Sequence, residues 1–329
     1  MLMKAIVYHK YGSPDVLKLE EVQKPTPADN QVLIKVYAAS INRSDWEGLV
    51  GKPLYARIGG LLKPNNKIPG SDIAGIVEAV GKDVRQFKPG DEVFGLMLNY
   101  GGGFAEYACK SENALALKPA GITFEDAAAI PQAAFIALQG IRDKGQVQPR
   151  QKVLINGAGG GTGTLAIQLA KLAGAEVTGV DNAEKMDLMR SLGADHVIDY
   201  TKEDFTKNGQ QYELILDVIA DRSVLAYKRA LAPNGNYFMA GGSVVTMFQM
   251  LLLGPWIRRT TGKKIRLLVV QTDAKDLVYM TELIESGKVV LAIDKRYSLS
   301  EAAEALRYLG EGHAKGKVVI TVEQSNRTQ

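Results

Sequence analysis

The sequence predicts an α/β protein with two domains, one rich in β-strands and one built on a doubly wound parallel sheet. Three observations support this prediction. The 329 residues are more than one ordinary hydrophobic core accommodates. Short apolar segments separated by Gly/Pro turns occupy the first third of the chain, and apolar segments alternate with helical ones after it. A glycine cluster follows the first apolar segment of this second region.

The first region predicts a compact, barrel-like domain of short strands. Residues suited to tight turns separate these strands, as in the Lys-Pro-Gly-Asp segment at 88–91. The predicted strands are 4–8, 31–38, 73–80 and 92–96.

The second region predicts a parallel sheet, because short apolar strands alternate with helical segments such as 165–173 and 184–192. This alternation is typical of a sheet that helices cover on both faces. The predicted strands are 153–155, 177–180, 196–198, 213–218, 237–240 and 266–270.

The glycine cluster at 152–164 (KVLINGAGGGTGT) predicts a nucleotide-binding turn. Glycine allows the backbone to turn tightly and to approach a pyrophosphate, which then lies at the positive end of the following helix. The spacing is G-x-x-G-x-x-G, and a glycine turn without a ligand is the less favoured alternative, given its strand–turn–helix context. The expected contacts are Gly157, Gly159, Gly160, Gly161, Thr162 and Gly163.

Residues after the second and third predicted strands indicate how the adenosine ribose is bound. Asp181 follows the second strand, where a carboxylate accepts hydrogen bonds from ribose hydroxyls and favours NADH. Lys185 and Tyr200 would instead bind the 2′-phosphate of NADPH. A solvated helix lysine and a strand-end tyrosine are equally acceptable explanations, so the sequence leaves NADPH and NADH open.

Composition excludes several classes of protein. The net charge of +4 is too small for a dedicated nucleic-acid binder. Cys109 is the single cysteine, so no intramolecular disulfide is possible and a reducing compartment is expected. The first residues lack the pattern of a secretory signal. The sequence therefore predicts a cytoplasmic protein.

Five motifs resemble those of medium-chain dehydrogenases/reductases, in particular the zeta-crystallin-like quinone oxidoreductase branch. The resemblance implies a GroES-like β-barrel-type catalytic domain at 1–121, completed by 288–329, and a Rossmann nucleotide-binding domain at 122–287. The motifs are AASINRSD (38–45), PGSDIAGIV (69–77), KPGDEV (88–93), GFAEY (103–107) and SLGAD (191–195).

The resemblance also implies that no zinc is bound. Zinc alcohol dehydrogenases of this family have a cysteine where Asn42 stands and a histidine where Ser71 stands, whereas a catalytic zinc needs about three protein ligands. Ser71 is expected to fill the vacated metal pocket, and Asp45 to cap a helix. The remaining candidate ligands are scattered without ligand spacing: His9, His196, His313 and Cys109.

Further side-chain roles follow from the resemblance. Asn42 would lie beside the nicotinamide, where its amide orients the ring or donates to the substrate; otherwise it holds a turn. Tyr55 and Tyr100 are candidate phenolic donors, although aromatic residues in surface loops would look the same. Gly241 and Lys317 complete the expected cofactor contacts, with a surface lysine as the alternative for Lys317.

Without a Lewis acid, hydride addition to a conjugated acceptor is easier than alcohol oxidation. The expected function is therefore a zinc-independent NADPH- or NADH-dependent reductase of quinones or enones, acting as a homodimer. The alternatives are a nucleotide-binding scaffold with little turnover and a zinc-free alcohol dehydrogenase. The apolar segment 244–257 is followed by basic residues. It is expected to line a substrate channel or to form a subunit contact, and a weak peripheral contact with a membrane is the alternative.

Overall fold

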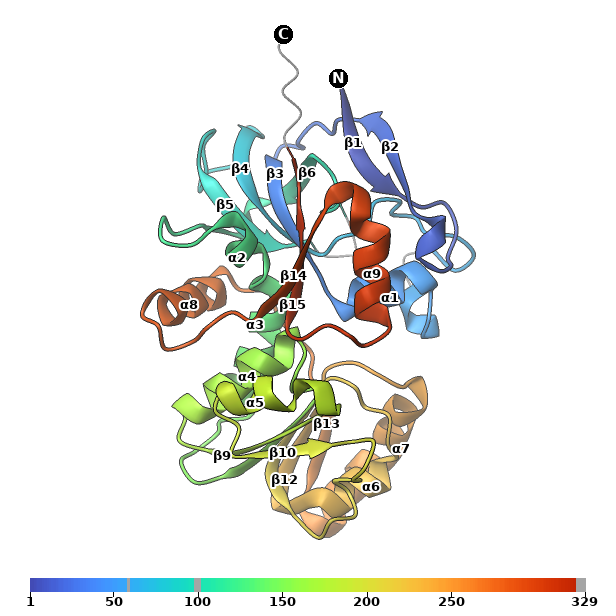
Figure 1. Ribbon diagram of the computed structural model, residues 1–329, viewed down its shortest axis with the longest axis vertical. Coiled ribbons are helices and arrows are strands. Elements are labelled where there is room, and N and C mark those ends of the chain that lie inside the picture. The colour runs from blue at the N-terminus through green and yellow to red at the C-terminus, as the bar shows by residue number, and fades with distance from the viewer. Residues whose placement is uncertain (58–59, 98–101, 324–329) are drawn as a thin grey trace. The chain divides into compact units, whose positions relative to one another are not determined.

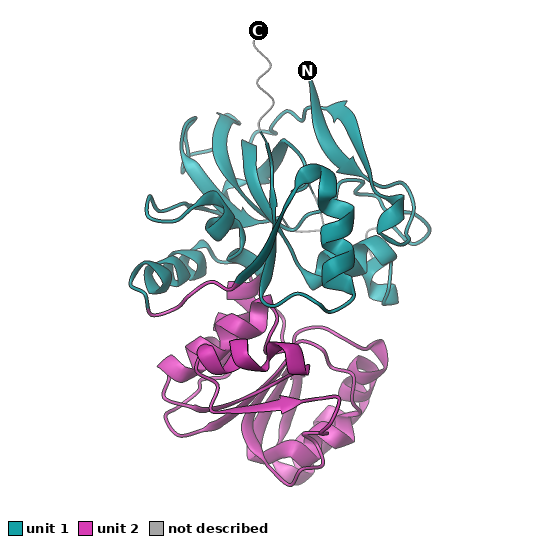
Figure 2. Cartoon of the chain, in the orientation of Figure 1, with its two compact units in different colours: residues 1–132, 272–287, 293–329 teal, residues 133–271, 288–292 magenta. Residues whose placement is uncertain are grey.

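The computed structural model describes residues 1–57, 60–97 and 102–323, and the chain divides into two compact units (Figure 2). Unit 1 consists of Met1–Gln132, Thr272–Gly287 and Ile293–Gln329, and unit 2 of Ala133–Gln271 and Lys288–Ala292. The functional domains expected from the sequence have boundaries at 121/122 and 287/288 and stay a prediction. The compact units differ from them because helix α2 (Phe124–Ala128) packs against strands β3 (Gln31–Ile41) and β4 (Asp72–Val80), and helix α8 (Ala274–Glu285) packs against strand β7 (Leu115–Leu117).

Unit 1 contains a sheet in the order β14-β15-β3-β4-β5-β7, with β6 also paired to β3, and a separate antiparallel ribbon of β1 and β2. Its neighbouring strands run antiparallel, except for β14 and β15, which are parallel. The bounds are β1 Leu2–Val7, β2 Lys18–Gln23, β3 Gln31–Ile41, β4 Asp72–Val80, β5 Glu92–Leu96, β6 Tyr107–Ser111, β7 Leu115–Leu117, β14 Ile293–Ser298 and β15 Lys317–Thr321. The four strands predicted for this region are confirmed.

Short helices connect these strands. Their bounds are η1 Pro14–Val16, α1 Arg43–Val50, η2 Leu54–Arg57, η3 Glu112–Ala114, α2 Phe124–Ala128, α8 Ala274–Glu285, η6 Leu299–Glu301 and α9 Ala302–Gly310. Helix α3 (Pro131–Leu138) begins in unit 1 and ends in unit 2.

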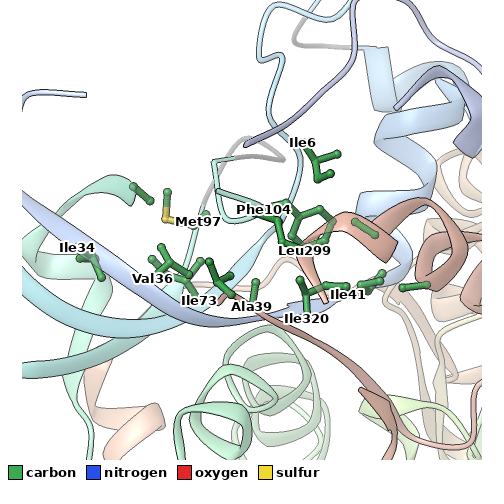
Figure 3. Close-up of a cluster of buried hydrophobic side chains, with 14 of the residues drawn as sticks. Ile6, Ile34, Val36, Ala39, Ile41, Ile73, Met97, Phe104, Leu299 and Ile320 are labelled. Carbon is green, nitrogen blue, oxygen red and sulfur yellow. The ribbon is translucent and has the colours of Figure 1, made fainter. Parts of the chain in front are cut away.

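One apolar core holds unit 1 together (Figure 3). It combines side chains from β3 and β4, such as Ile34 and Ile73, with Phe104 and with residues near the C-terminus, such as Leu299 and Ile320. Segments nearly 300 residues apart in sequence therefore share one core, because β15 pairs with β3. Burial of these side chains provides the driving force that fixes the C-terminal strand in unit 1.

Unit 2 contains a parallel sheet in the order β10-β9-β8-β11-β12-β13. Counted from its first strand, this order is 3-2-1-4-5-6, the doubly wound arrangement that the alternating pattern predicts. Five of the six predicted strands are confirmed, and the sixth, predicted at 266–270, lies at 264–267 and overlaps the prediction only at Arg266 and Leu267. Their bounds are β8 Lys152–Asn156, β9 Glu176–Asp181, β10 His196–Asp199, β11 Tyr212–Asp217, β12 Leu231–Met239 and β13 Lys264–Leu267.

Helices pack against both halves of this sheet (Figure 1). Helices α4 and α5 contact β8, β9 and β10, and helices α6 and α7 contact β12 and β13. The bounds are η4 Gln139–Asp143, α4 Gly161–Leu172, η5 Ala183–Lys185, α5 Met186–Ser191, α6 Val224–Ala230 and α7 Val244–Thr261. Across the described ranges, none of these or the other helices combines the length and the apolar character needed to cross a bilayer.

Candidate active site

The cofactor residues expected in unit 2 gather at one edge of its sheet. Gly157 follows β8, Asp181 ends β9, Tyr200 follows β10 and Gly241 lies beyond the end of β12. The carboxyl ends of parallel strands meet at the same edge, and the order reverses between β8 and β11. Ligands of doubly wound sheets bind at this switch point.

The glycine turn connects β8 to α4 and leaves hydrogen-bond donors at the helix start. Gly157 has a φ of 84°, a left-handed conformation that glycine adopts without a steric penalty. Gly160 caps α4 without a side-chain hydrogen bond. The N–H groups of Gly161, Thr162 and Gly163 belong to the first turn, where no intrahelical acceptor exists. These donors, together with the helix dipole, are suited to bind an anion.

The glycines of the turn are required for different reasons. A Cβ on Gly163 would lie 2.3 Å from the carbonyl oxygen of Gly157 and 2.5 Å from Cα of Ala158, so Gly163 is needed for close packing of the turn against the helix. A Cβ on Gly160 would meet only the Gly157 oxygen, at 3.5 Å. The chain itself therefore tolerates a side chain at Gly160, and the space beside it is open to a ligand.

Asp181 and Lys185 form a buried ion pair beside the turn. The Lys185 Nζ lies 3.2 Å from Oδ1 of Asp181, and the backbone N–H of Gly159 donates to Oδ2 at 3.0 Å. The N–H of Asn182 donates to Oδ1 at 2.9 Å. A Cβ on Gly159 would lie 2.6 Å from Cβ of Lys185. Glycine at 159 therefore makes room for the lysine that neutralises Asp181.

Tyr200 and Gly241 lie close to this edge with open surroundings. The N–H of Tyr200 donates to the carbonyl of Asp181 at 3.1 Å, and its side chain is 50% exposed. A Cβ on Gly241 would meet only the carbonyl oxygen of Val218, at 3.6 Å. The space around the Tyr200 side chain and the space beside Gly241 are therefore not filled by other parts of the described chain. Both residues stay predicted cofactor contacts.

Sequence reasoning missed a buried polar pair between the two central strands. The Asn156 side chain at the end of β8 donates to Oδ1 of Asp217 at the end of β11, at 2.9 Å. The N–H groups of Ile219 and Ala220 also donate to this oxygen. Tyr237 donates to Oδ2 at 3.0 Å. Burial raises the pKa of Asp217 despite these bonds. A polar residue at each of two strand ends was the available sequence signal.

In unit 1, Asn42 stands between the longest strand and the first α-helix. Strand β3 ends at Ile41, and Asn42 is the extended N-cap of α1. The Asp45 carboxylate accepts the N–H of Asn42 at 2.7 Å. This bond fixes the peptide group of Asn42 at the helix start. Asp45 therefore caps a helix, as expected.

The side chain of Asn42 is the centre of a buried polar cluster. Its Nδ2 donates to Ser71 Oγ at 2.9 Å and to Asp72 Oδ2 at 2.7 Å. Its Oδ1 accepts from Lys317 Nζ at 2.6 Å. Because a lysine only donates and a carboxylate only accepts, this arrangement fixes which end of the amide is oxygen. Both amide hydrogens are used inside the chain.

Charge is nearly balanced within this cluster. Lys317 Nζ lies 3.3 Å from Asp72 Oδ2, and Asp72 also accepts from Ser40 and from the N–H of Gln132. Asp45 accepts from Ser71 through Oδ2, but its buried Oδ1 has no hydrogen-bond partner among the described residues. Two carboxyl groups thus face one ammonium group. Burial raises the pKa of Asp45 to about 7. Near neutral pH the Asp45 carboxyl group is therefore protonated in part of the molecules.

Two outcomes at this cluster differ from the sequence analysis. Lys317 is 3% exposed, so the alternative that it is an ordinary surface lysine is wrong. Strand β15 turns it inward because Val318 pairs with Ile41, next to Asn42. Asp72 was not named as a site residue, although it is fully buried. A carboxylate followed directly by a run of small and apolar residues, from Ile73 to Val77, was the signal that could have identified it.

The two tyrosines expected as donors have different outcomes. Tyr55 lies in η2 and is half-buried, and its hydroxyl donates to Glu47 at a long 3.3 Å. Tyr100 lies outside the described residues.

The residues present fit a dinucleotide better than a zinc ion. The open space at Gly160 and the first-turn N–H groups of α4 suit a pyrophosphate. At the position of the family's zinc, by contrast, Asn42 and Ser71 offer an amide and a hydroxyl, and the Lys317 ammonium occupies the same cluster. Zinc prefers Cys, His or carboxylate ligands. No group of three or more His, Cys, Asp or Glu residues that could hold a metal occurs in the described parts of the chain.

Comparisons with known proteins identify the family of the chain. Residues 28–120 match the alcohol dehydrogenase GroES-like domain, and residues 192–320 match a family described as zinc-binding dehydrogenase. The chain is 33% identical to the chloroplastic quinone-oxidoreductase QR1 of Triphysaria versicolor, covering 97% of this chain and 98% of the relative. It is 36% identical to the chloroplastic NADPH-dependent alkenal/one oxidoreductase of Arabidopsis thaliana, covering 97% and 79%.

A solved structure extends the similarity to the whole fold. The quinone oxidoreductase from Coxiella burnetii superimposes with a TM-score of 0.90 at 29% identity, covering 98% of this chain and all of the other. Together with the glycine turn and the Asn42 cluster, these similarities show that the chain belongs to the medium-chain dehydrogenase/reductase family, among its quinone oxidoreductases and enone reductases.

Proposed function

We propose that this protein is an NAD(P)H-dependent oxidoreductase that reduces quinones or α,β-unsaturated carbonyl compounds without zinc. The observation that carries the proposal is the Asn42 cluster, in which an amide and a hydroxyl stand at the position of the family's zinc ligands and the carboxylates of Asp45 and Asp72 are already bound to Ser71, Asn42 and Lys317. Relatives named for quinone and for alkenal/one reduction support the same substrate class.

The chemistry suits a site that lacks a Lewis acid. A bound nicotinamide supplies a hydride. When the β-carbon of an enone accepts it, the C=C electron pair shifts and negative charge develops on the carbonyl oxygen, which hydrogen-bond donors stabilise. A proton then completes the saturated ketone. Alcohol oxidation would instead require a group that lowers the pKa of the alcohol.

The saturated hydrogen bonds of Asn42 restrict its role. Both hydrogens of its amide are held by Ser71 and Asp72, so donation to a substrate would break a buried bond. Its Oδ1 has a second lone pair beside the bond from Lys317. We therefore assign Asn42 to orienting the nicotinamide through this oxygen. Tyr100 or water would donate to the developing oxyanion, whereas the Tyr55 hydroxyl would first have to release its long hydrogen bond to Glu47.

We propose NADPH as the preferred cofactor. Repulsion of a 2′-phosphate by Asp181 is offset because Lys185 neutralises this carboxylate at 3.2 Å. Two backbone N–H groups already occupy the Asp181 oxygens, which leaves the carboxylate less available to ribose hydroxyls. Lys185 has further donors for a phosphate, and the exposed Tyr200 hydroxyl is a second one.

The test is oxidation of NADPH and of NADH, followed by absorbance, against quinones and enones with and without a chelator. Turnover that resists the chelator and prefers NADPH is the expected result. Turnover that the chelator abolishes and zinc restores would refute the zinc-free assignment. Nucleotide binding without turnover on any acceptor would support a scaffold role instead.

We also propose that the protein is a homodimer. Sedimentation velocity of the purified chain measures its oligomeric state.

A further inference from the structure

Helix α7 exposes an apolar face that the rest of the described chain does not cover. Its buried side chains, Thr246, Met250, Gly254 and Ile257, pack inward. The helical repeat places Val245, Phe248, Leu252 and Trp256 on the opposite side. With the adjacent Leu251, these residues form what we call the α7 patch, and each of the five is between 55% and 77% exposed.

A surface helix of this kind is unusual. The outward face of a helix packed on a protein is normally polar, whereas a helix that is apolar all round is normally buried. Contiguous exposed apolar patches mark contacts with other proteins or with membranes. The α7 patch therefore indicates a partner, and the surrounding charge indicates which one.

The chain segment that contains α7 carries only basic charged residues, and the nearby carboxylates of Asp204 and Asp221 are ion-paired with Arg222 at its start. Residues 222–272 contain eight Lys and Arg residues and no Asp or Glu. Arg258 and Arg259 occupy the last turn of α7 and are exposed. The Lys228 ammonium lies 5.1 Å from the ring centroid of Trp256. Cationic groups therefore border the patch along one end and one side.

These cations are held close to one another. Lys263 donates to the carbonyl of Lys228 at 2.9 Å, and burial followed by the charge of Lys228 lowers the pKa of Lys263. Burial followed by the charge of Arg258 lowers the pKa of Arg266. Like charges gathered without a neighbouring carboxylate are stabilised by an external anion.

We propose that α7 docks on the surface of an anionic phospholipid bilayer, with the α7 patch inserted among the headgroups and its basic border against the phosphates. An interfacial helix combines these two features, an inserted apolar face and flanking Lys and Arg residues. A second copy could cover the apolar face, but its own α7 segment would supply no carboxylate to the basic border, since residues 222–272 contain no Asp or Glu. Nucleic acid would leave Phe248 and Leu252 without apolar partners.

Vesicle sedimentation of the full chain tests the proposal without any need for turnover, so its outcome is independent of the proposed reductase activity. The protein is mixed with phosphatidylcholine vesicles, with or without about 30% phosphatidylglycerol, at about 0.05 M and 0.5 M salt. Binding to the anionic vesicles at low salt, weakened at high salt, is expected. No binding to anionic vesicles at low salt would overturn the proposal.

Two variants separate the apolar and the electrostatic contributions. Phe248→Ser with Leu252→Ser removes the centre of the patch, and Arg258→Glu with Arg259→Glu reverses its border. Each pair should lower the partition coefficient about tenfold or more. The matched controls are Leu172→Ser, a half-exposed leucine on α4, and Lys10→Glu with Lys18→Glu, which change the net charge equally. The controls should bind as the unmodified chain does.

Trp256 gives a second readout from inside the patch. The chain has two tryptophans, so Trp46→Phe leaves Trp256 as the sole one. Its emission should shift to the blue on anionic vesicles and not on neutral ones. Unchanged emission together with unchanged sedimentation of the patch variants would refute the proposal. Loss of a dimer in Phe248→Ser with Leu252→Ser, without lipid binding by the unmodified chain, would identify a subunit interface instead.

Discussion

The Nζ atom of Lys317 lies 2.6 Å from Oδ1 of Asn42, although the two residues are 275 positions apart. The contact exists because β15 pairs antiparallel with β3, with Val318 opposite Ile41. Lys317 then also reaches Asp72 on β4. The C-terminal strand thus supplies the positive charge that balances the carboxylate of a site formed mainly by residues 40–72.

Loss of this ammonium group should destabilise the protein. Lys317→Met leaves the fully buried Asp72 without its charge partner, so the free energy of unfolding should fall by about 3–5 kcal/mol. Urea denaturation measures this change. Adding Asp72→Asn to the same chain should restore part of the loss, because no uncompensated carboxylate remains. A double variant as unstable as Lys317→Met would show that the ion pair is not the cause.

Asp45 should make stability depend on pH. Its pKa is raised by burial from 3.8 to about 7 in the folded chain, so between these values the folded state binds more protons than the unfolded state. The contribution of Asp45 to stability is therefore lost as pH rises from about 4 to 7. Asp45→Asn, which keeps an acceptor oxygen for Asn42 and Ser71, should gain stability relative to the unmodified chain across this range.

Urea denaturation of both chains at pH 5 and pH 7.5 checks this expectation. Since each pKa unit corresponds to about 1.4 kcal/mol, the difference between the chains should change by more than about 1 kcal/mol. An Asp45→Asn variant whose stability follows that of the unmodified chain at both pH values would contradict a raised pKa.

Two alanine substitutions in the glycine turn should have different effects. Gly163→Ala places Cβ 2.3 Å from a backbone oxygen, so it should lower the melting temperature. Gly160→Ala meets no atom closer than 3.5 Å, so the fold should be kept while NADPH binding weakens about tenfold or more, because the methyl group enters the space assigned to pyrophosphate. Thermal unfolding and calorimetric titration measure the two effects. Full NADPH affinity in Gly160→Ala would place the pyrophosphate elsewhere.

Lys185 should discriminate between the two nucleotides. Lys185→Gln removes the cation expected to bind the 2′-phosphate, so the KM for NADPH should rise about tenfold and the KM for NADH should change less. Lys202→Gln, which alters an exposed lysine nearby, is the control and should leave both values unchanged. Equal increases for the two nucleotides would assign Lys185 only to neutralising Asp181.

Much of unit 2 could be predicted from sequence, because local patterns determine it. Glycine spacing, strand–helix alternation and strand-end polar residues are short-range features, and five of the six strands and the position of the turn follow from them. The ion-pair partner of Asp181 was harder to predict from the sequence. Lys185 was expected to bind phosphate, and its pairing with Asp181 depends on how η5 folds back over Gly159.

The unit 1 cluster could be predicted only in part. Asn42 and Ser71 were identified through motifs, but the saturation of the Asn42 amide depends on β15, which the local sequence does not place beside β3. Asp72 was missed because an acidic residue before an apolar strand usually faces solvent. The outward face of α7 was also ambiguous, since an apolar helix in sequence is compatible with a buried one.

Transfer of deuterium from [4,4-²H₂]NADPH, which carries deuterium on both faces of the nicotinamide C4, to an enone tests the central claim most directly. Hydride transfer from the nicotinamide predicts one deuterium on the β-carbon of the saturated ketone, detected by NMR, in the presence of a chelator. A product whose β-hydrogen comes from water, or no reduction of any enone or quinone by a chain that binds NADPH, would contradict it.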